Sequence, residues 1–254
     1  MSRRIDTPTA FLRAGGRGSA TKTLVVCAGD SITQGSASAN YVDLLKQRWT
    51  PRGFAFVNAG VNGNLAWNVL RRLDEIMACR PDVVTLLIGT NDVNATFNDT
   101  WRATYRKEQS LPRDPDLGWY RENVGSILDR ISRESSARVI VLEIPMLGED
   151  LGSLMNHRVD DYNNVLRTLA AEHGAPCLPL HDRLASLLPT DSAAPAYRGD
   201  RMFIARSILG HLALRRSWNE VSRRNGLTLL TDHIHLNDRA AAVVADLISE
   251  SLDS

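Results

Sequence analysis

The chain has 254 residues, of which 43% are hydrophobic and 23% charged, which is ordinary usage for one globular domain with a full core. Its 30 basic and 29 acidic side chains nearly balance, so we expect no nucleic-acid partner and no attraction to a charged membrane surface. No apolar run approaches the roughly 20 residues that a membrane-spanning helix needs.

Residues 1–22 contain four arginines among small residues and no long apolar segment, so the sequence predicts no secretory signal there. We interpret them as a flexible leader before a single domain over residues 23–254. Three cysteines (Cys27, Cys79 and Cys177) cannot all pair, and two of them lie inside apolar runs. This pattern indicates buried thiols in a reducing compartment, and the expected location is cytoplasmic.

Short apolar segments alternate with longer amphipathic ones along the chain. The short segments predict five strands, at 23–28, 54–58, 83–88, 138–144 and 175–180. The amphipathic segments predict helices at 41–49, 65–78, 119–133, 157–173 and 238–252. Residues 94–118 and 145–156 are expected to be irregular, the first because of Pro112 and Pro115.

Repeated strand–helix alternation predicts an α/β fold, a three-layer α/β/α sandwich around a five-stranded parallel sheet. Residues 189–228 are long for a simple connection and contain apolar residues at helical spacing. They predict a helical insertion, which is either a lid over the site or an extra helix packed on the sheet. Ligands of such sheets gather beyond the carboxyl ends of the strands, so site residues should follow strands directly.

Four polar segments carry the candidate chemistry, three directly after strands and one before the last helix: 29–33, 58–64, 89–92 and 232–237. A serine hydroxyl, here Ser31, is a poor nucleophile until a base takes its proton. The imidazole of His235 suits that task at neutral pH. Asp232, three residues earlier, is close enough to orient the ring if the segment makes one turn.

In their order and spacing, these segments resemble the blocks of the GDSL/SGNH hydrolases, from residue 24 to the last helix. The resemblance implies a flavodoxin-like strand order, cleavage of carboxylic esters through an acyl-enzyme, and no cofactor. It implies Ser31 as nucleophile, with Asp232 and His235 completing a catalytic triad. It also implies an oxyanion hole from Ser31, Gly63 and Asn91. Ile32 stands where the family name has leucine, a change that touches no reacting atom.

Structural interpretations compete with this reading, since such residues also serve as a helix cap, a turn glycine, an Asx turn and a buried histidine. Four segments with only such structural roles would have to meet at one sheet edge by coincidence, so we favour the catalytic interpretation. His233 suggests a metal site with Asp232, His235 and Asp238. On an extended chain, however, His233 and His235 point to opposite sides, and no second group of ligands is visible, so we expect no metal.

The substrate is the least determined part of the hypothesis. The expected partner is a small-molecule ester, and its pocket should be built by the loops after the strands. The candidate substrate-binding residues are therefore Asn64, Trp67, Asp92, Pro145 and Met146. Two alternatives stay open, an acyltransferase on the same triad and a non-catalytic binding protein that retains the fold. The sequence makes no prediction of the oligomeric state.

Overall fold

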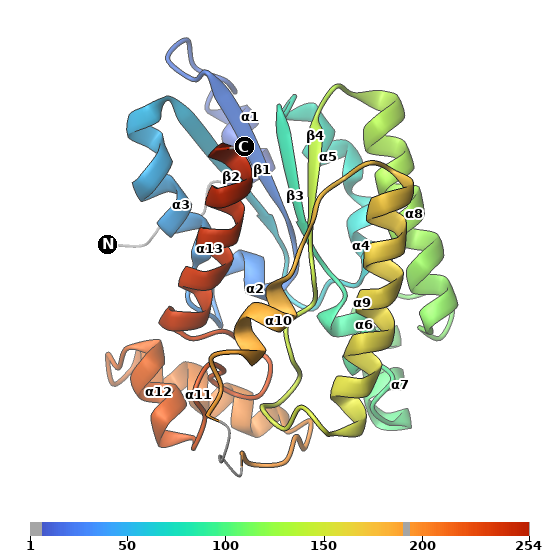
Figure 1. Cartoon of the computed structure of the whole chain (residues 1–254), viewed down its shortest axis with the longest axis vertical. Helices are drawn as coiled ribbons and strands as arrows, with labels where there is room; N and C mark the ends of the chain where they lie inside the picture. The colour runs from blue at the N-terminus through green and yellow to red at the C-terminus, as the bar shows by residue number, and fades with distance from the viewer. Residues whose placement is uncertain (1–6, 190–193, 254) are drawn as a thin grey trace.

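The computed structural model describes residues 7–189 and 194–253, built around a five-stranded parallel sheet (Figure 1). The strands are β1 (Thr23–Gly29), β2 (Phe54–Gly60), β3 (Val83–Leu87), β4 (Arg138–Leu142) and β5 (Cys177–Leu178). Their order is β2-β1-β3-β4-β5, and every neighbouring pair is parallel. This is the flavodoxin-like order, so the expected fold class is confirmed.

Helices cover both faces of the sheet, which explains why its strands are almost continuously apolar. One face packs against α3 (Tyr41–Trp49), α10 (Leu180–Ala185) and α13 (Asp238–Asp253). The other packs against α4 (Ala66–Arg71), α5 (Leu73–Ala78), α8 (Leu117–Glu134) and α9 (Leu154–Glu172). Within β1, Leu24 and Val26 belong to the second core, whereas Val25 and Cys27 belong to the first. This alternation produces the three layers seen in Figure 1.

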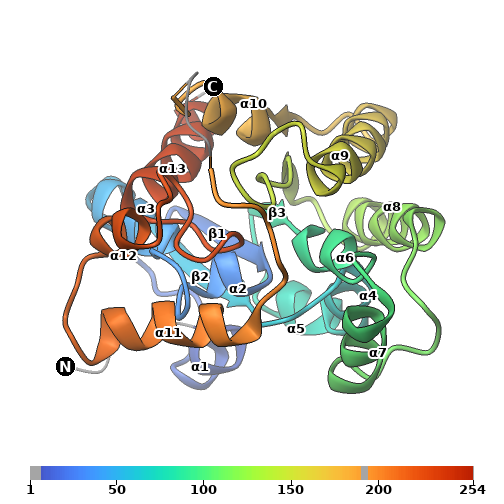
Figure 2. The same cartoon turned by 90° about the horizontal axis from the view of Figure 1, so that it is seen from below.

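The remaining elements lie outside these layers, several of them at the carboxyl end of the sheet, at the bottom of Figure 1. They are α1 (Pro8–Arg13), α2 (Ser31–Gln34), the 3-10 helix η1 (Thr50–Arg52), α6 (Thr90–Asn94), α7 (Asp99–Glu108), α11 (Arg201–Leu212) and α12 (Trp218–Arg224). Figure 2, seen from below, shows α2 between the helices that cover the two faces of the sheet, with α7 and α11 in the lower part of the view.

Two sequence-based expectations about helices are wrong. Helix α7 lies inside the stretch expected to be irregular, because both prolines come after its last residue and Asn98 caps its start by accepting the N–H of Trp101. The helix expected over 65–78 is split at Arg72. The guanidinium of Arg72 turns inward to donate to the carbonyls of Gly29 (3.0 Å) and Ala59 (2.7 Å). A local cap therefore determines the first feature, whereas tertiary contacts accompany the second.

Two segments were expected in addition to the sheet and its covering helices, the leader and the insertion. The expected leader contains α1, whose Phe11 packs against the main hydrophobic core, and Arg17 pairs with Asp82. Its first six residues lie outside the described part of the chain. The expected insertion contains α11 and α12, while residues 190–193 lie outside the described part. Both described segments are packed on the domain.

Candidate active site

Ser31 is the first residue of α2, two positions after β1 ends. Asp30 caps this helix by accepting the N–H of Ile32 (2.9 Å). Gly60, the last residue of β2, allows α2 to lie against the sheet, because a Cβ there would come within 2.2 Å of the Gln34 nitrogen. The short helix and the glycine together hold Ser31 at the carboxyl edge of the sheet.

The segment before α13 folds into a tight loop that begins and ends in a bridge between Leu230 and Leu236. Within it, Asp232 Oδ1 accepts the N–H groups of Ile234 (3.1 Å) and His235 (2.9 Å). The N–H of Thr231 donates to the His235 carbonyl (2.7 Å). These bonds explain locally why an aspartate three residues before a histidine brings carboxylate and ring together.

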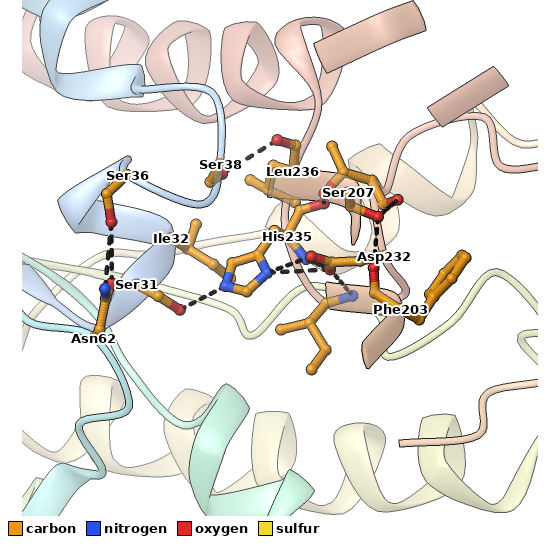
Figure 3. Close-up of polar contacts among 12 residues, drawn as sticks. Ser31, Ile32, Ser36, Ser38, Asn62, Phe203, Ser207, Asp232, His235 and Leu236 are labelled. Carbon is orange, nitrogen blue, oxygen red and sulfur yellow. Dashed lines mark hydrogen bonds and ion pairs between the residues drawn. The ribbon is translucent and has the colours of Figure 1, made fainter. Parts of the chain in front are cut away.

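A continuous chain of hydrogen bonds joins three of the expected site residues (Figure 3). His235 Nδ1 lies 2.8 Å from Asp232 Oδ2, and His235 Nε2 lies 2.9 Å from Ser31 Oγ. All three side chains are buried, with 7% of Ser31, 6% of His235 and 2% of Asp232 exposed. The serine comes from the first strand–helix junction and the histidine from the loop before the last helix, 204 residues later. The fold thus brings them into contact.

The charges of this chain are set by burial and by the pair itself. Burial lowers the pKa of His235, but the Asp232 charge and its hydrogen bond, with Asp30 nearby, outweigh burial and leave that pKa above its ordinary value. Burial likewise raises the pKa of Asp232, but the attraction to His235 and the hydrogen bonds to the carboxylate leave it below its ordinary value. The imidazolium form is therefore favoured beside an ionised Asp232.

The other two expected residues lie beside Ser31, and Gly63 and Asn91 line the same cavity as Ser31 and His235. Gly63 has φ +74°, a conformation that favours glycine, and a Cβ there would meet the side-chain nitrogen of Gln109 at 2.5 Å. Asn91 Nδ2 donates to the carbonyl of Asn64 (2.9 Å). Ser31, Gly63, Asn91 and His235 therefore share the lining of one cavity.

Two further buried carboxyls stand close to these residues. Burial raises the pKa of Asp30 to about 6, against the hydrogen bond from the Ile32 N–H. Burial, with repulsion from Asp30, raises the pKa of Asp92 to about 8, so Asp92 is largely protonated at neutral pH. Asp92 therefore adds little negative charge beside Asn91 to that of Asp30.

The cavity beside Ser31 has a volume of about 340 Å³. One wall is apolar and comes mainly from α11 and from the loop of residues 230–236 that carries His235, the histidine loop, through Ile204, Ala205, Ile208 and Ile234. The opposite side is polar and aromatic and comes mainly from α7, through Trp101, Thr104, Tyr105, Glu108 and Gln109. An ion pair between Glu108 and Arg201 (2.8 Å), both half-exposed, links α7 to α11 beside it.

The five expected substrate-binding residues do not line this cavity. Asn64 and Asp92 are buried, the first accepting from the Arg72 guanidinium (2.8 Å) and the second from the Ala66 N–H. The other three belong to hydrophobic packing rather than to the cavity wall. Trp67 packs against Trp119, Met146 is fully buried, and Pro145 is buried between β4 and α9. The segments after the strands reach the cavity through Ser31, Gly63 and Asn91, and α7 and α11 supply most of its remaining wall.

His233 and Glu149 show how the histidine loop is fixed. His233, at φ +73°, packs its ring against Phe203 and Tyr197 rather than toward Asp232. The buried carboxylate of Glu149 accepts three consecutive backbone N–H groups, at 2.7 to 3.0 Å, from residues 228–230. Glu149 was not among the residues expected from the sequence, because no sequence pattern marks a carboxylate that accepts backbone N–H groups. Among the described residues no group of three or more potential metal ligands gathers.

The model of the GDSL-like lipase/acylhydrolase family matches residues 27–243. The chain belongs to that family. It is a carboxylic ester hydrolase, as the resemblance implied. No helix in the described part of the chain is long and apolar enough to cross a membrane.

An acetylxylan esterase of Geobacillus stearothermophilus is 27% identical over 221 residues, covering 79% of this chain and 93% of that protein. The structure of Axe2, an acetylxylan esterase of the same organism, has a TM-score of 0.65 at 20% identity and covers 92% of this chain and 95% of that one. The acetyl xylan esterase AlAXEase has a TM-score of 0.61 at 20% identity, with 90% and 99% covered. These structures share the fold of this family member.

Proposed function

We propose that the chain is a serine esterase that removes acetyl groups from the hydroxyls of a carbohydrate, with Ser31, His235 and Asp232 as its catalytic triad. The observation that carries the proposal is the buried hydrogen-bond chain from Ser31 Oγ through the imidazole to Asp232. A pure binding protein has no use for this arrangement, whereas acyl transfer to a serine requires it.

In the first step Ser31 Oγ attacks the ester carbonyl while His235 Nε2 takes the hydroxyl proton. Asp232 holds the other ring nitrogen as a donor and stabilises the imidazolium that forms. His235 then returns the proton to the departing alcohol, which leaves an acetyl group on Ser31. Water, deprotonated by the same imidazole, releases acetate and restores the serine.

Negative charge develops on the carbonyl oxygen in both steps. The N–H groups of Ser31 and Gly63 and the side-chain amide of Asn91 form the proposed oxyanion hole. A single donor of this kind typically lowers the barrier by about 3 kcal/mol. No cofactor is required for this sequence of steps.

The acetyl and carbohydrate specificity is proposed from the two sides of the cavity. Its modest volume and its isoleucine-rich wall suit a short acyl group. Trp101, Thr104 and Gln109 on the other side supply a ring face and hydrogen-bonding groups suited to a sugar. Two relatives named as acetylxylan esterases support the same substrate class.

Acetate release tests this proposal directly. We expect the wild type to deacetylate acetylated xylo-oligosaccharides and p-nitrophenyl acetate, and to turn over p-nitrophenyl esters more slowly as the acyl chain lengthens. Ser31→Ala, prepared identically, gives the background rate. Equal rates in the two proteins on all these esters would contradict the proposal, and product transfer to an added sugar alcohol would instead indicate an acyltransferase.

The pH dependence of kcat/KM provides an independent prediction. His235 must be neutral to accept the serine proton, so activity falls as the pH drops through its pKa. Because that pKa is raised, the acid limb should have its midpoint above the ordinary histidine value of about 6.5. A pH series on p-nitrophenyl acetate measures it. A midpoint clearly below that value would show that the Asp232 charge does not reach the ring.

A cytoplasmic location completes the proposal. Cys27, Cys79 and Cys177 are all free thiols, the first two of them buried, and free thiols persist in a reducing compartment.

A further inference from the structure

The amide of Asn91 is the end of a chain of side-chain hydrogen bonds that runs away from Ser31. The hydroxyl of Tyr105 donates to Asn91 Oδ1 at 2.6 Å. Asn94 Nδ2 donates to the Tyr105 oxygen at 3.1 Å, and the Tyr197 hydroxyl donates to Asn94 Oδ1. In each of these hydrogen bonds the donor lies on the side of Tyr197 and the acceptor on the side of Asn91. The chain therefore runs in one direction, from residue 197 beside α11 to the amide beside Ser31.

The partners of Asn91 make its two amide atoms inequivalent. One N–H of Nδ2 donates to the Asn64 carbonyl at 2.9 Å. The other meets the Asp30 carboxyl only at 3.4 Å, a long contact from which a bound oxyanion can take this N–H. Oδ1 faces the Tyr105 hydroxyl, which has its own acceptor position filled by Asn94 and therefore donates. A reversed amide would put oxygen against oxygen at Asn64 and nitrogen against a donor at Tyr105.

The buried position of this chain gives the hydroxyl its importance. Asn91 and Tyr105 line the cavity but are only 5% and 7% exposed, so most of each side chain depends on partners within the protein. Without the Tyr105 hydroxyl, Oδ1 would be a buried acceptor with no partner, which favours rotation of the amide away from this arrangement. Aligned hydrogen bonds also polarise one another, which strengthens the terminal N–H as a donor.

We propose that Tyr105 is a positioning residue of the oxyanion hole, holding the Asn91 amide with its nitrogen toward the oxyanion through a chain that Asn94 and Tyr197 continue. The proposal rests on the proposed function, in which Asn91 binds the oxyanion. Tyr105 acts through Asn91 and takes no part in proton transfer. Because the chain ends at Tyr197, it also ties the segment before α11 to the donor beside Ser31.

Another tyrosine of the protein provides a matched control for the loss of the Tyr105 hydroxyl. Tyr162 is buried, 3% exposed, and its hydroxyl has no hydrogen-bond partner in the described structure. Tyr162→Phe therefore removes the same atom from a similarly buried ring without touching the site. We expect it to keep the wild-type kcat.

Steady-state kinetics on p-nitrophenyl acetate test the proposal. Tyr105→Phe should lower kcat about tenfold to a hundredfold, less than the loss of about 10²–10³ expected for removal of an oxyanion donor in Asn91→Ala. KM should change by less than about threefold, because positioning affects the transition state more than substrate binding. Tyr197→Phe, at the outer end of the chain, should show a smaller loss of the same kind.

The double variant separates positioning from a general structural effect. In an Asn91→Ala background, Tyr105→Phe should change kcat by less than about twofold, because the group that it positions is gone. An equal loss in both backgrounds, or a wild-type kcat in Tyr105→Phe, would overturn the proposal. If Tyr105→Phe does not fold, the same cycle with Tyr197→Phe and Asn91→Ala decides in the same way.

A neutron structure of Tyr105→Phe, which distinguishes the amide nitrogen from the oxygen, is a readout that needs no activity. It should show the Asn91 amide turned from the Asn64 carbonyl or present in two orientations, and an unchanged single orientation would overturn the proposal. Failure of the proposed function looks different, because the wild type and Ser31→Ala would then hydrolyse esters at the same rate whatever Asn91 does.

Discussion

Ser31→Ala should lower kcat for p-nitrophenyl acetate by about 10⁵–10⁶-fold, the largest effect of any single substitution in this protein. In the proposed mechanism the change removes the atom that forms the acyl-enzyme and leaves the oxyanion donors in place. The residual rate then comes from binding and oxyanion stabilisation alone. Stopped-flow or steady-state release of p-nitrophenolate measures it, with the thermal midpoint as a check that the protein is folded.

His235→Ala tests whether the two residues act as one unit. Removal of the base should cost nearly as much as removal of the nucleophile, and the double variant should be no slower than Ser31→Ala. Losses that multiply in the double variant would mean that the 2.9 Å contact between Ser31 Oγ and His235 Nε2 does not carry the reaction.

Asp232→Asn should lower kcat by about 10⁴-fold while leaving the loop intact. Asp232 Oδ1 is held by the N–H groups of Ile234 and His235, so the amide oxygen of the asparagine takes that position. The amide nitrogen must then occupy the place of Oδ2, facing His235 Nδ1 at 2.8 Å. An N–H donor there forces the proton of a neutral ring onto Nε2, which can no longer accept a proton from Ser31.

Glu143→Gln is the matched control for this substitution. Glu143 is also a buried carboxylate, 2% exposed, but it binds Arg167 and the N–H of His181 and does not line the cavity. We expect this variant to lose stability and to retain kcat.

In Asp232→Asn the acid limb of the pH profile should also move to lower pH, since the charge that raises the His235 pKa is gone. A wild-type kcat in Asp232→Asn would contradict the assigned role.

The sequence by itself determined the fold class and the positions of Ser31, Gly63, Asn91, Asp232 and His235 relative to the strands. These features are local, because buried strands are continuously apolar and the carboxyl ends of parallel strands meet at one edge. Four short segments that each follow a strand, or precede the last helix, therefore had to approach one another. Their family was recognisable for the same reason.

Only the tertiary structure decided what surrounds these residues. Most of the wall of the cavity beside Ser31 comes from α7, which proline content obscured, and from α11, whereas Asn64 and Asp92 are buried outside its lining. Tyr105 reaches Asn91 across 14 positions, and Tyr197 reaches Asn94 across 103. Such contacts depend on where a helix packs and which buried polar atom lacks a partner. No periodicity or local propensity encodes either of them.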